Sequence, residues 1–174
     1  MDYSLYLYPL QPTGLAASDL QKKLEQMAFA TPGETPESCL PGANLMDYIT
    51  FLGCSPALQR GEIESIIRLH SADKAFAMGG ESVVTLRYPG CQHKIDNAPA
   101  IIERFDQPWR CPQCDNSGDF NDINWRKSAA VASLFIEITA VFPKEAVPSD
   151  KLLEQLKQTS DADWSWFYSR SQSL

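Results

Sequence analysis

The sequence predicts an α+β domain in which a mostly antiparallel sheet carries two main helices on one face and an insertion in its middle. Three observations predict this fold. The 174 residues suit a single domain, 1–174, because a core of this size buries roughly 70% of the surface of the unfolded chain. Alternating apolar residues, typical of strands, recur along the whole chain. Helical periodicity occurs in two segments, one near each end.

The chain opens with a predicted strand and a predicted helix. Residues 3–8 alternate aromatic and aliphatic side chains, which is typical of a strand, and a proline ends the run. Residues 18–29 carry leucines at helical spacing and predict an amphipathic helix. Ser18 followed by Gln21 resembles a capping box at the start of this helix.

A long loop is predicted over residues 31–44. This segment contains three prolines and two glycines, which disfavour both helix and strand pairing. Long loops inside a compact domain are often functional. The alternative is a surface excursion that packs through Cys39 and Leu40.

Three short strands are predicted in the middle of the chain. Residues 47–52 and 62–70 alternate as strands on either side of a turn-rich segment, so we expect them to pair as a hairpin. A third strand over 82–88 follows the turn at Gly79-Gly80 and leads directly into Pro89-Gly90-Cys91.

The end of the chain predicts a strand, a helix and a final strand. Residues 134–142 and 164–168 are the strands, and the helix begins after Pro148-Ser149. This tail predicts an open sheet with helices on one face, similar in outline to ferredoxin-like α+β sandwiches. The alternating aromatics of the last strand serve either the sheet core or a partner-binding surface.

Composition and charge narrow the classes of function. The net charge of −7 repels phosphate backbones and anionic lipids, so nucleic acid is a poor partner. We expect no signal peptide and no membrane span, because no basic leader and no run of about 18 apolar residues occurs. Five cysteines without a secretory signal suit the reducing cytoplasm, where thiols act as ligands or core residues.

Two pairs of metal-ligating residues carry the strongest chemical signal. They are Cys91-Gln92-His93 and, after seventeen further residues, Cys111-Pro112-Gln113-Cys114. A Cys-x-x-Cys turn brings two thiolates together, and Cys-x-His puts a sulfur and an imidazole on the same side of an extended segment. Zinc prefers a closed tetrahedron of such ligands. We therefore predict one structural Zn²⁺ bound by Cys91, His93, Cys111 and Cys114, in a zinc-knuckle subregion at 89–118.

The segment 108–114, PWRCPQC, resembles the knuckle of zinc ribbons and rubredoxin-type folds over these few residues. That resemblance implies a glycine after the second cysteine, where this chain has Asp115. We expect Asn116 or Gly118 to supply the left-handed backbone instead. The first pair also departs from the pattern, since it is Cys-x-His rather than Cys-x-x-Cys.

Other uses of these cysteines stay open: buried thiols without metal, a redox pair or an iron site. A catalytic zinc is a further alternative, because zinc-dependent nucleobase deaminases carry His-x-Glu followed by Pro-Cys-x-x-Cys. Here Lys94 and Ile95 follow His93, so the proton-transferring glutamate is missing. Four protein ligands also leave no position for a reactive water.

One further pair of residues is a candidate for catalysis. Cys54 could act as a nucleophile with His70 as its base. The alternative is a buried thiol in a turn and a histidine satisfied at a strand edge.

Three classes of function follow from these observations. We expect a small cytosolic protein-interaction or regulatory module stabilised by structural zinc. The alternatives are an enzyme or enzyme subunit, and a nucleic-acid-binding zinc ribbon that would use the basic residues near the knuckle. The expected partner is another protein, and a basic one where Asp161 and Asp163 border the aromatic strand.

Overall fold

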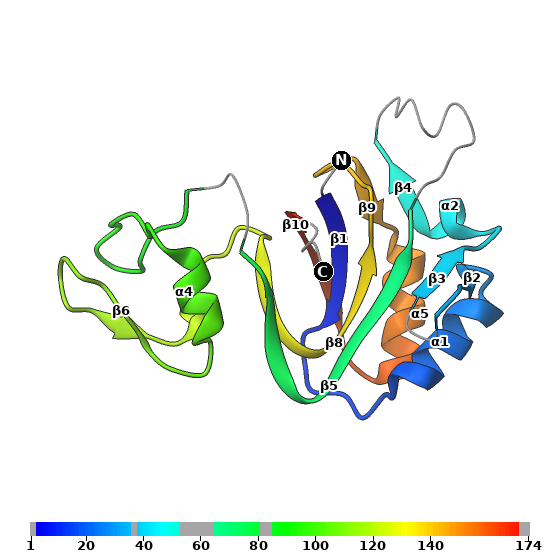
Figure 1. The fold of residues 1–174 in the computed structure, drawn as a ribbon, viewed down its shortest axis with the longest axis horizontal. Helices are drawn as coiled ribbons and strands as arrows, with labels where there is room; N and C mark the ends of the chain where they lie inside the picture. Colours follow the sequence, from blue (N-terminus) through cyan, green and yellow to red (C-terminus); the bar gives the residue numbers. More distant parts are fainter. Residues whose placement is uncertain (1–2, 36–37, 53–64, 81–84, 171–174) are drawn as a thin grey trace.

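The computed structural model describes residues 3–35, 38–52, 65–80 and 85–170 (Figure 1). It is a single α+β domain with a mostly antiparallel sheet and four α-helices within these ranges. The strands are β1 (Tyr3–Pro9), β2 (Ala30–Pro32), β3 (Ser38–Pro41), β4 (Ile49–Phe51), β5 (Ile67–Gly79), β6 (Trp109–Arg110), β7 (Ser117–Gly118), β8 (Ala129–Ile138), β9 (Ala146–Pro148) and β10 (Trp164–Arg170). The helices are α1 (Ala17–Gln26), α2 (Leu45–Tyr48), α4 (Ala98–Glu103), α5 (Asp150–Ser160) and the 3-10 turn Phe120–Asp122.

The central sheet has six strands in the order β10-β1-β8-β5-β3-β2, and every neighbouring pair is antiparallel. Since β1 is antiparallel to both β8 and β10, those two strands are parallel to each other. The predicted strand-helix-strand tail is therefore confirmed, with β1 lying between its strands. The order β1-α1-β5-β8-α5-β10 is the β-α-β-β-α-β pattern of ferredoxin-like folds.

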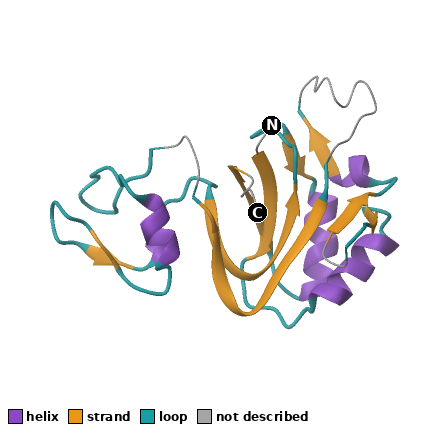
Figure 2. Ribbon diagram, viewed as in Figure 1, coloured by secondary structure: helices purple, strands orange, loops and turns teal. Residues whose placement is uncertain are grey.

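Both main helices cover the same face of the sheet, as predicted (Figure 2). Leu20 and Leu24 of α1 and Leu152 and Leu156 of α5 are fully buried against it. None of the helices in the described ranges combines the length and the hydrophobicity needed to cross a bilayer. The main core comprises, among others, Leu5, Leu7, Leu20, Leu24, Phe29, Cys39, Ile49, Ile67, Ile136, Ile138, Leu152, Leu156 and Trp164.

The two main helices begin differently. Ser149 caps α5, because its Oγ accepts a hydrogen bond from the Leu152 N–H at 3.2 Å. The capping box predicted for the first helix is wrong. Ala16 is the N-cap residue of α1 and makes no side-chain cap, since Ser18 already lies inside the first turn. Gln21 donates instead to Glu25 on the same helix face.

Helix α1 also ends three residues before the predicted end at Phe29. Ala28 adopts a left-handed φ of 51°, and the Phe29 N–H donates to the Leu24 carbonyl at 3.0 Å. This is the Schellman arrangement that commonly ends helices, made here with alanine where glycine is usual. It turns Phe29 into the main core.

The prediction of an unpaired loop over 31–44 is wrong in part, because β2 and β3 form a hairpin there. Prolines are tolerated in this hairpin since β2 is the edge of the sheet, where Pro32 has no neighbour on its outer side. Cys39 is buried in the main core as the alternative expected, but Leu40 is 51% exposed.

The predicted hairpin between 47–52 and 62–70 is also wrong. Residues 45–48 form a helical turn, and β4 pairs with β9 rather than with β5. Residues 53–64 lie outside the described ranges, and so does Cys54. The second strand begins at Ile67 and continues to Gly79, with a register shift between Ser71 and Phe76 where β5 curves strongly (Figure 1).

Two further strand boundaries differ from prediction. Of the strand predicted at 82–88, residues 82–84 lie outside the described ranges, and the described remainder makes one bridge, from Arg87 to Lys94. The strand predicted at 134–142 is β8, which runs from Ala129 to Ile138. Gly79 and Gly80, where a turn was predicted, adopt positive φ angles of 100° and 94°, and Gly79 is the last residue of β5.

Candidate functional site

Between β5 and β8 the chain forms an insertion that projects from the end of these two strands (Figure 1). Its described part, residues 85–128, has a core of its own. Two indoles in it are satisfied by backbone carbonyls: Trp109 Nε1 donates to Asp119 and Trp125 Nε1 to Phe120. The insertion core comprises Leu86, Tyr88, Ile95, Trp109, Cys111, Phe120, Ile123 and Trp125, packed on Ala129 of β8.

The first ligand pair lies at the tip of a tight turn. The Tyr88 N–H donates to the His93 carbonyl at 2.9 Å, and the Gln92 N–H donates to the Tyr88 carbonyl at 3.1 Å. Gly90 and Gln92 take left-handed φ angles of 84° and 60°. The turn therefore places the side chains of Cys91 and His93 on the same side of the backbone. The sequence had predicted an extended segment here, which is wrong.

The second pair lies in the turn between β6 and β7. The Asp115 N–H donates to the Cys111 carbonyl at 3.0 Å, and the Cys111 N–H donates to the Asn116 carbonyl at 2.8 Å. Asp115 itself adopts the left-handed φ, at 60°, so the expectation that Asn116 or Gly118 would do so is wrong. Gly118 is instead required for space, because a Cβ there would lie 2.7 Å from Trp109 Cζ2.

The two turns bring three of the four predicted ligands together. The ligand atoms of Cys91, His93 and Cys111 all lie within 4.8 Å of one another, and the two sulfurs are 3.5 Å apart. Cys111 is fully buried, Cys91 is half-buried and His93 is exposed. These three residues could therefore bind a metal ion.

The fourth predicted ligand, Cys114, is exposed and lies outside this group of three. The Asn116 N–H lowers its pKa, but hydrogen bonds with the thiols of Cys91 and Cys111 raise the pKa to about 11. Burial raises the pKa of Cys111, yet the N–H groups of Gln113 and Cys114 more than offset this and lower it overall. Cys111 is thus the thiol that ionises more readily, and the role of Cys114 as a ligand stays a prediction.

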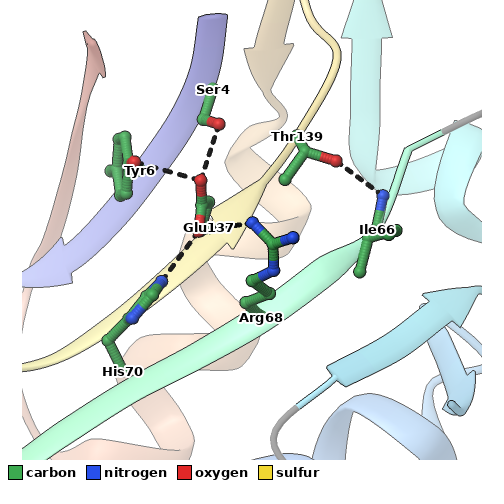
Figure 3. Close-up of polar contacts among 7 residues, drawn as sticks. All are labelled: Ser4, Tyr6, Ile66, Arg68, His70, Glu137 and Thr139. Carbon is green, nitrogen blue, oxygen red and sulfur yellow. Dashed lines mark hydrogen bonds and ion pairs between the residues drawn. The ribbon is translucent and has the colours of Figure 1, made fainter. Parts of the chain in front are cut away.

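A second polar site, centred on Glu137 of β8, was missed by sequence reasoning (Figure 3). Its carboxylate is 3% exposed and accepts hydrogen bonds from Ser4 Oγ at 2.7 Å and Tyr6 Oη at 3.0 Å. His70 Nε2 lies 2.8 Å from its other oxygen, and Arg68 Nη1 lies 3.7 Å away. We call these five residues the Glu137 cluster.

Strand register builds the Glu137 cluster. Glu137 lies directly opposite Tyr6 on β1 and Arg68 on β5. Its neighbours Ile136 and Ile138 point into the main core, so alternation turns Glu137 to the face that the helices leave uncovered. The only signal in the sequence is an acid inside the apolar run Leu134 to Ile138.

The electrostatics of the Glu137 cluster favour an ionised carboxylate. Burial raises the pKa of Glu137, but hydrogen bonds from His70 and Ser4 and the charge of His70 lower it overall. Burial, followed by the charge of Glu137, raises the pKa of Tyr6 well above its usual value. Tyr6 therefore remains a neutral donor. His70 is bonded to Glu137, as the alternative of a satisfied histidine expected, and the pairing with Cys54 stays untested.

The aromatic strand β10 serves the sheet core. Trp164 is buried in the main core and its indole donates to Ser160 Oγ at 2.8 Å. Phe167 is buried on the opposite face, where its ring stacks on Tyr6 at 4.9 Å between centroids. Beside this strand, the Asp163 carboxylate pairs with Lys157 Nζ at 2.8 Å.

The chain matches no family model, no curated protein and no solved structure. The proposals that follow are therefore built on the geometry and chemistry of these residues.

Proposed function

We propose that this protein is a cytoplasmic protein-interaction module whose subregion 89–118 is stabilised by one structural Zn²⁺. The ligands in this proposal are Cys91, His93, Cys111 and Cys114. The observation that carries it is the convergence of Cys91, His93 and Cys111 from two separate turns. Cys91 and Cys111 are 20 residues apart in the sequence, and the insertion core, on which both pack, holds the two turns together.

The observed spacing fits zinc. In a tetrahedral site with Zn–S bonds of about 2.3 Å, two sulfurs lie about 3.8 Å apart. Cys91 Sγ and Cys111 Sγ are 3.5 Å apart, so binding requires a shift of only a few tenths of an ångström. Cys114 suits the fourth position, since hydrogen bonds join its thiol to those of Cys91 and Cys111. Thiolates with an imidazole suit zinc better than magnesium or calcium, which prefer oxygen.

The surroundings of the site favour a structural role for the metal. Cys111 is fully buried within the insertion core. Three thiolates and one imidazole would fill all four coordination positions of a zinc ion, so no position remains for a reactive water. The described part of the insertion has two-residue strands, a six-residue helix and a three-residue 3-10 turn, so a metal cross-link would contribute much of its folding free energy. A structural metal takes no part in a reaction and instead fixes the surface of the insertion, which supports a role in binding another protein.

Metal content per chain tests this proposal. We expect one zinc per wild-type chain and its loss in the variants Cys111→Ser and Cys114→Ser. Cys39→Ser is the matched control. Cys39 is buried in the main core and is not one of the proposed zinc ligands, so this variant should keep its zinc. A folded wild type without metal contradicts the proposal, and so does full zinc content in Cys114→Ser.

The interaction role has its own test. A stoichiometric protein partner should remain bound to the zinc-loaded chain and dissociate when a chelator removes the metal. Retention on heparin at physiological salt would favour the nucleic-acid-binding alternative instead.

An enzyme is the second candidate, and the Glu137 cluster favours it. A histidine held by a buried carboxylate is the usual arrangement of a general base. A cavity of about 510 Å³, lined by residues that include Gln21, His70 and Phe76, lies beside it. Turnover of a panel of activated esters by the wild type, abolished in His70→Asn but retained in Asp73→Asn, at an exposed position of β5 that does not line the cavity, would support this candidate. Absence of turnover by the wild type speaks against it.

A further inference from the structure

A groove lies where the insertion meets the sheet. It has a volume of about 410 Å³, within the range of roughly 300–1,000 Å³ typical of ligand sites. One wall comes from the end of β1 and the residue after it, and the other comes from the segment that leads into β8. Residues that line it include Tyr8, Leu10, Phe120, Trp125, Arg126 and Lys127.

The groove combines apolar side chains such as Tyr8 and Leu10 with polar ones, and two of the polar side chains are cations without an ion pair in the described ranges. Neither Arg126 nor Lys127 forms an ion pair with a carboxylate in the described part of the chain, whereas Arg110 and Lys157 both do. Lys127 Nζ lies 3.5 Å from the centroid of the Trp166 ring, and burial lowers the pKa of Lys127. A carboxylate in the groove would supply the charge that these two side chains lack.

The two cations are presented on a rigid turn. Arg126 and Lys127 adopt consecutive left-handed φ angles of 50° and 56°, which side chains with a Cβ rarely do. The turn is fixed by Asn124 Oδ1, which accepts from the Arg126 N–H at 3.0 Å, and by the Lys127 carbonyl, which accepts from the Tyr168 N–H at 3.1 Å. Strained backbone of this kind persists where the surroundings determine it, and it reduces the entropy lost on binding.

We propose that this groove binds an acidic segment of a partner protein, with a carboxylate against Arg126 and Lys127 and an apolar side chain against Tyr8 and Leu10. This inference rests on the proposed interaction role and names the chemistry of the partner. Leu10 is 54% exposed and provides apolar surface at the rim of the groove.

The charges elsewhere support an acidic peptide over the alternatives. Nucleic acid would meet a net charge of −7 and only two unpaired cations in the groove. A basic partner was expected beside Asp161 and Asp163, but the Asp163 carboxylate already pairs with Lys157. The net charge of −7 repels an acidic segment from the molecule as a whole, so such a segment requires local unpaired cations where it binds, and the groove offers two.

The test uses the full, zinc-loaded chain and a fluorescein-labelled peptide that is rich in glutamate and contains one leucine, followed by fluorescence anisotropy. The matched probe replaces every glutamate with glutamine. We expect the acidic peptide to bind at least about tenfold more tightly, and Arg126→Gln and Lys127→Gln each to weaken it about tenfold. Leu10→Ser should weaken it severalfold, because it removes apolar surface from the groove.

Arg104→Gln is the matched control, since it removes one positive charge from an exposed position of the insertion that does not line the groove. It should change the affinity by less than about twofold. Melting temperatures equal to that of the wild type show that each variant is folded. Equal affinity for both peptides, no binding of the acidic peptide, or an equal effect of Arg104→Gln overturns the inference.

Zinc content measured on the same samples separates the two proposals. Zinc without binding of the acidic peptide overturns the groove and leaves the metal centre. Binding of the acidic peptide by a chain that contains no metal overturns the metal centre and leaves the groove. A natural partner retained equally by the wild type and by Arg126→Gln/Lys127→Gln also overturns the groove, while the interaction role stands.

Discussion

The central sheet and the insertion differ in the length of their elements and in the size of their cores. Six strands and two main helices give the sheet a main core in which Leu5, Leu24 and Ile136 are fully buried. The insertion has strands of two residues and a helix of six, and a smaller core around Trp109 and Trp125. A region with long, mutually paired elements can fold through burial alone, whereas a region of short elements requires a cross-link.

The two regions also use their polar groups differently. In the sheet, Glu137 is satisfied within the protein by Ser4, Tyr6 and His70, so the cluster is complete without a ligand. In the insertion, the thiols of Cys91, Cys111 and Cys114 form weak contacts with one another, and the backbone N–H groups of Gln113 and Cys114 donate to Cys111. Polar groups that are satisfied specify the fold, and ligands that lack a strong partner indicate where something else binds.

The largest expected effect separates the two regions directly. Removal of zinc by a chelator should unfold the insertion and leave the sheet intact, because structural zinc contributes on the order of 10 kcal/mol of folding free energy. Hydrogen exchange should show fast amides over 85–128 and protected amides in β1 and β8. Uniform protection after complete metal removal would mean that the insertion core is sufficient by itself.

The next effect tests the sheet. Glu137→Ala leaves the donors of Ser4 and Tyr6 and the charge of Arg68 without their buried partner. We expect a loss of about 3–5 kcal/mol in the free energy of unfolding, measured by urea denaturation. Glu34→Gln, at an exposed position, should change it by less than about 0.5 kcal/mol. A similar small change in Glu137→Ala would show that water replaces the carboxylate.

Local signals predicted the C-terminal part of the chain well. Helix α5, its Ser149 cap and strand β10 follow from residues that are neighbours in the sequence. The same holds for the ligand pairs, since each lies within one turn, although the meeting of the two turns depends on tertiary packing. The role of Cys114 as the fourth ligand remains a prediction, because the ligand atoms that lie within 4.8 Å of one another belong to Cys91, His93 and Cys111.

Non-local pairing accounts for most of the errors. The hairpin expected between 47–52 and 62–70 failed because β4 pairs with β9, almost a hundred positions further along the chain. The Glu137 cluster was missed for the same reason, since Ser4 and Glu137 are 133 residues apart in the sequence. Alternation predicts which face a side chain occupies, but not which strand lies beside it.

A smaller effect concerns the pH dependence of the sheet. Hydrogen bonds from His70 and Ser4, outweighing burial, hold the folded-state pKa of Glu137 below its unfolded value, which is near 4.3 for a free glutamate. The stabilisation is therefore complete above the unfolded pKa and is lost as the pH falls through the folded pKa. The difference in unfolding free energy between the wild type and Glu137→Gln should stay constant near neutral pH and narrow below about pH 4. A difference that widens on acidification would mean that burial dominates the pKa.

The smallest effect compares two serines that the sequence treats alike. Ser149 caps α5 through the Leu152 N–H, so Ser149→Ala should cost about 1 kcal/mol of unfolding free energy. Ser18 lies inside the first turn of α1 and makes no cap, so Ser18→Ala should change stability by less than about 0.5 kcal/mol and could increase it, since alanine is the better helix former. Thermal denaturation of both variants measures the contrast. Equal losses would place the start of α1 at Ser18 after all, and the capping box expected from Ser18 and Gln21 would then form in solution.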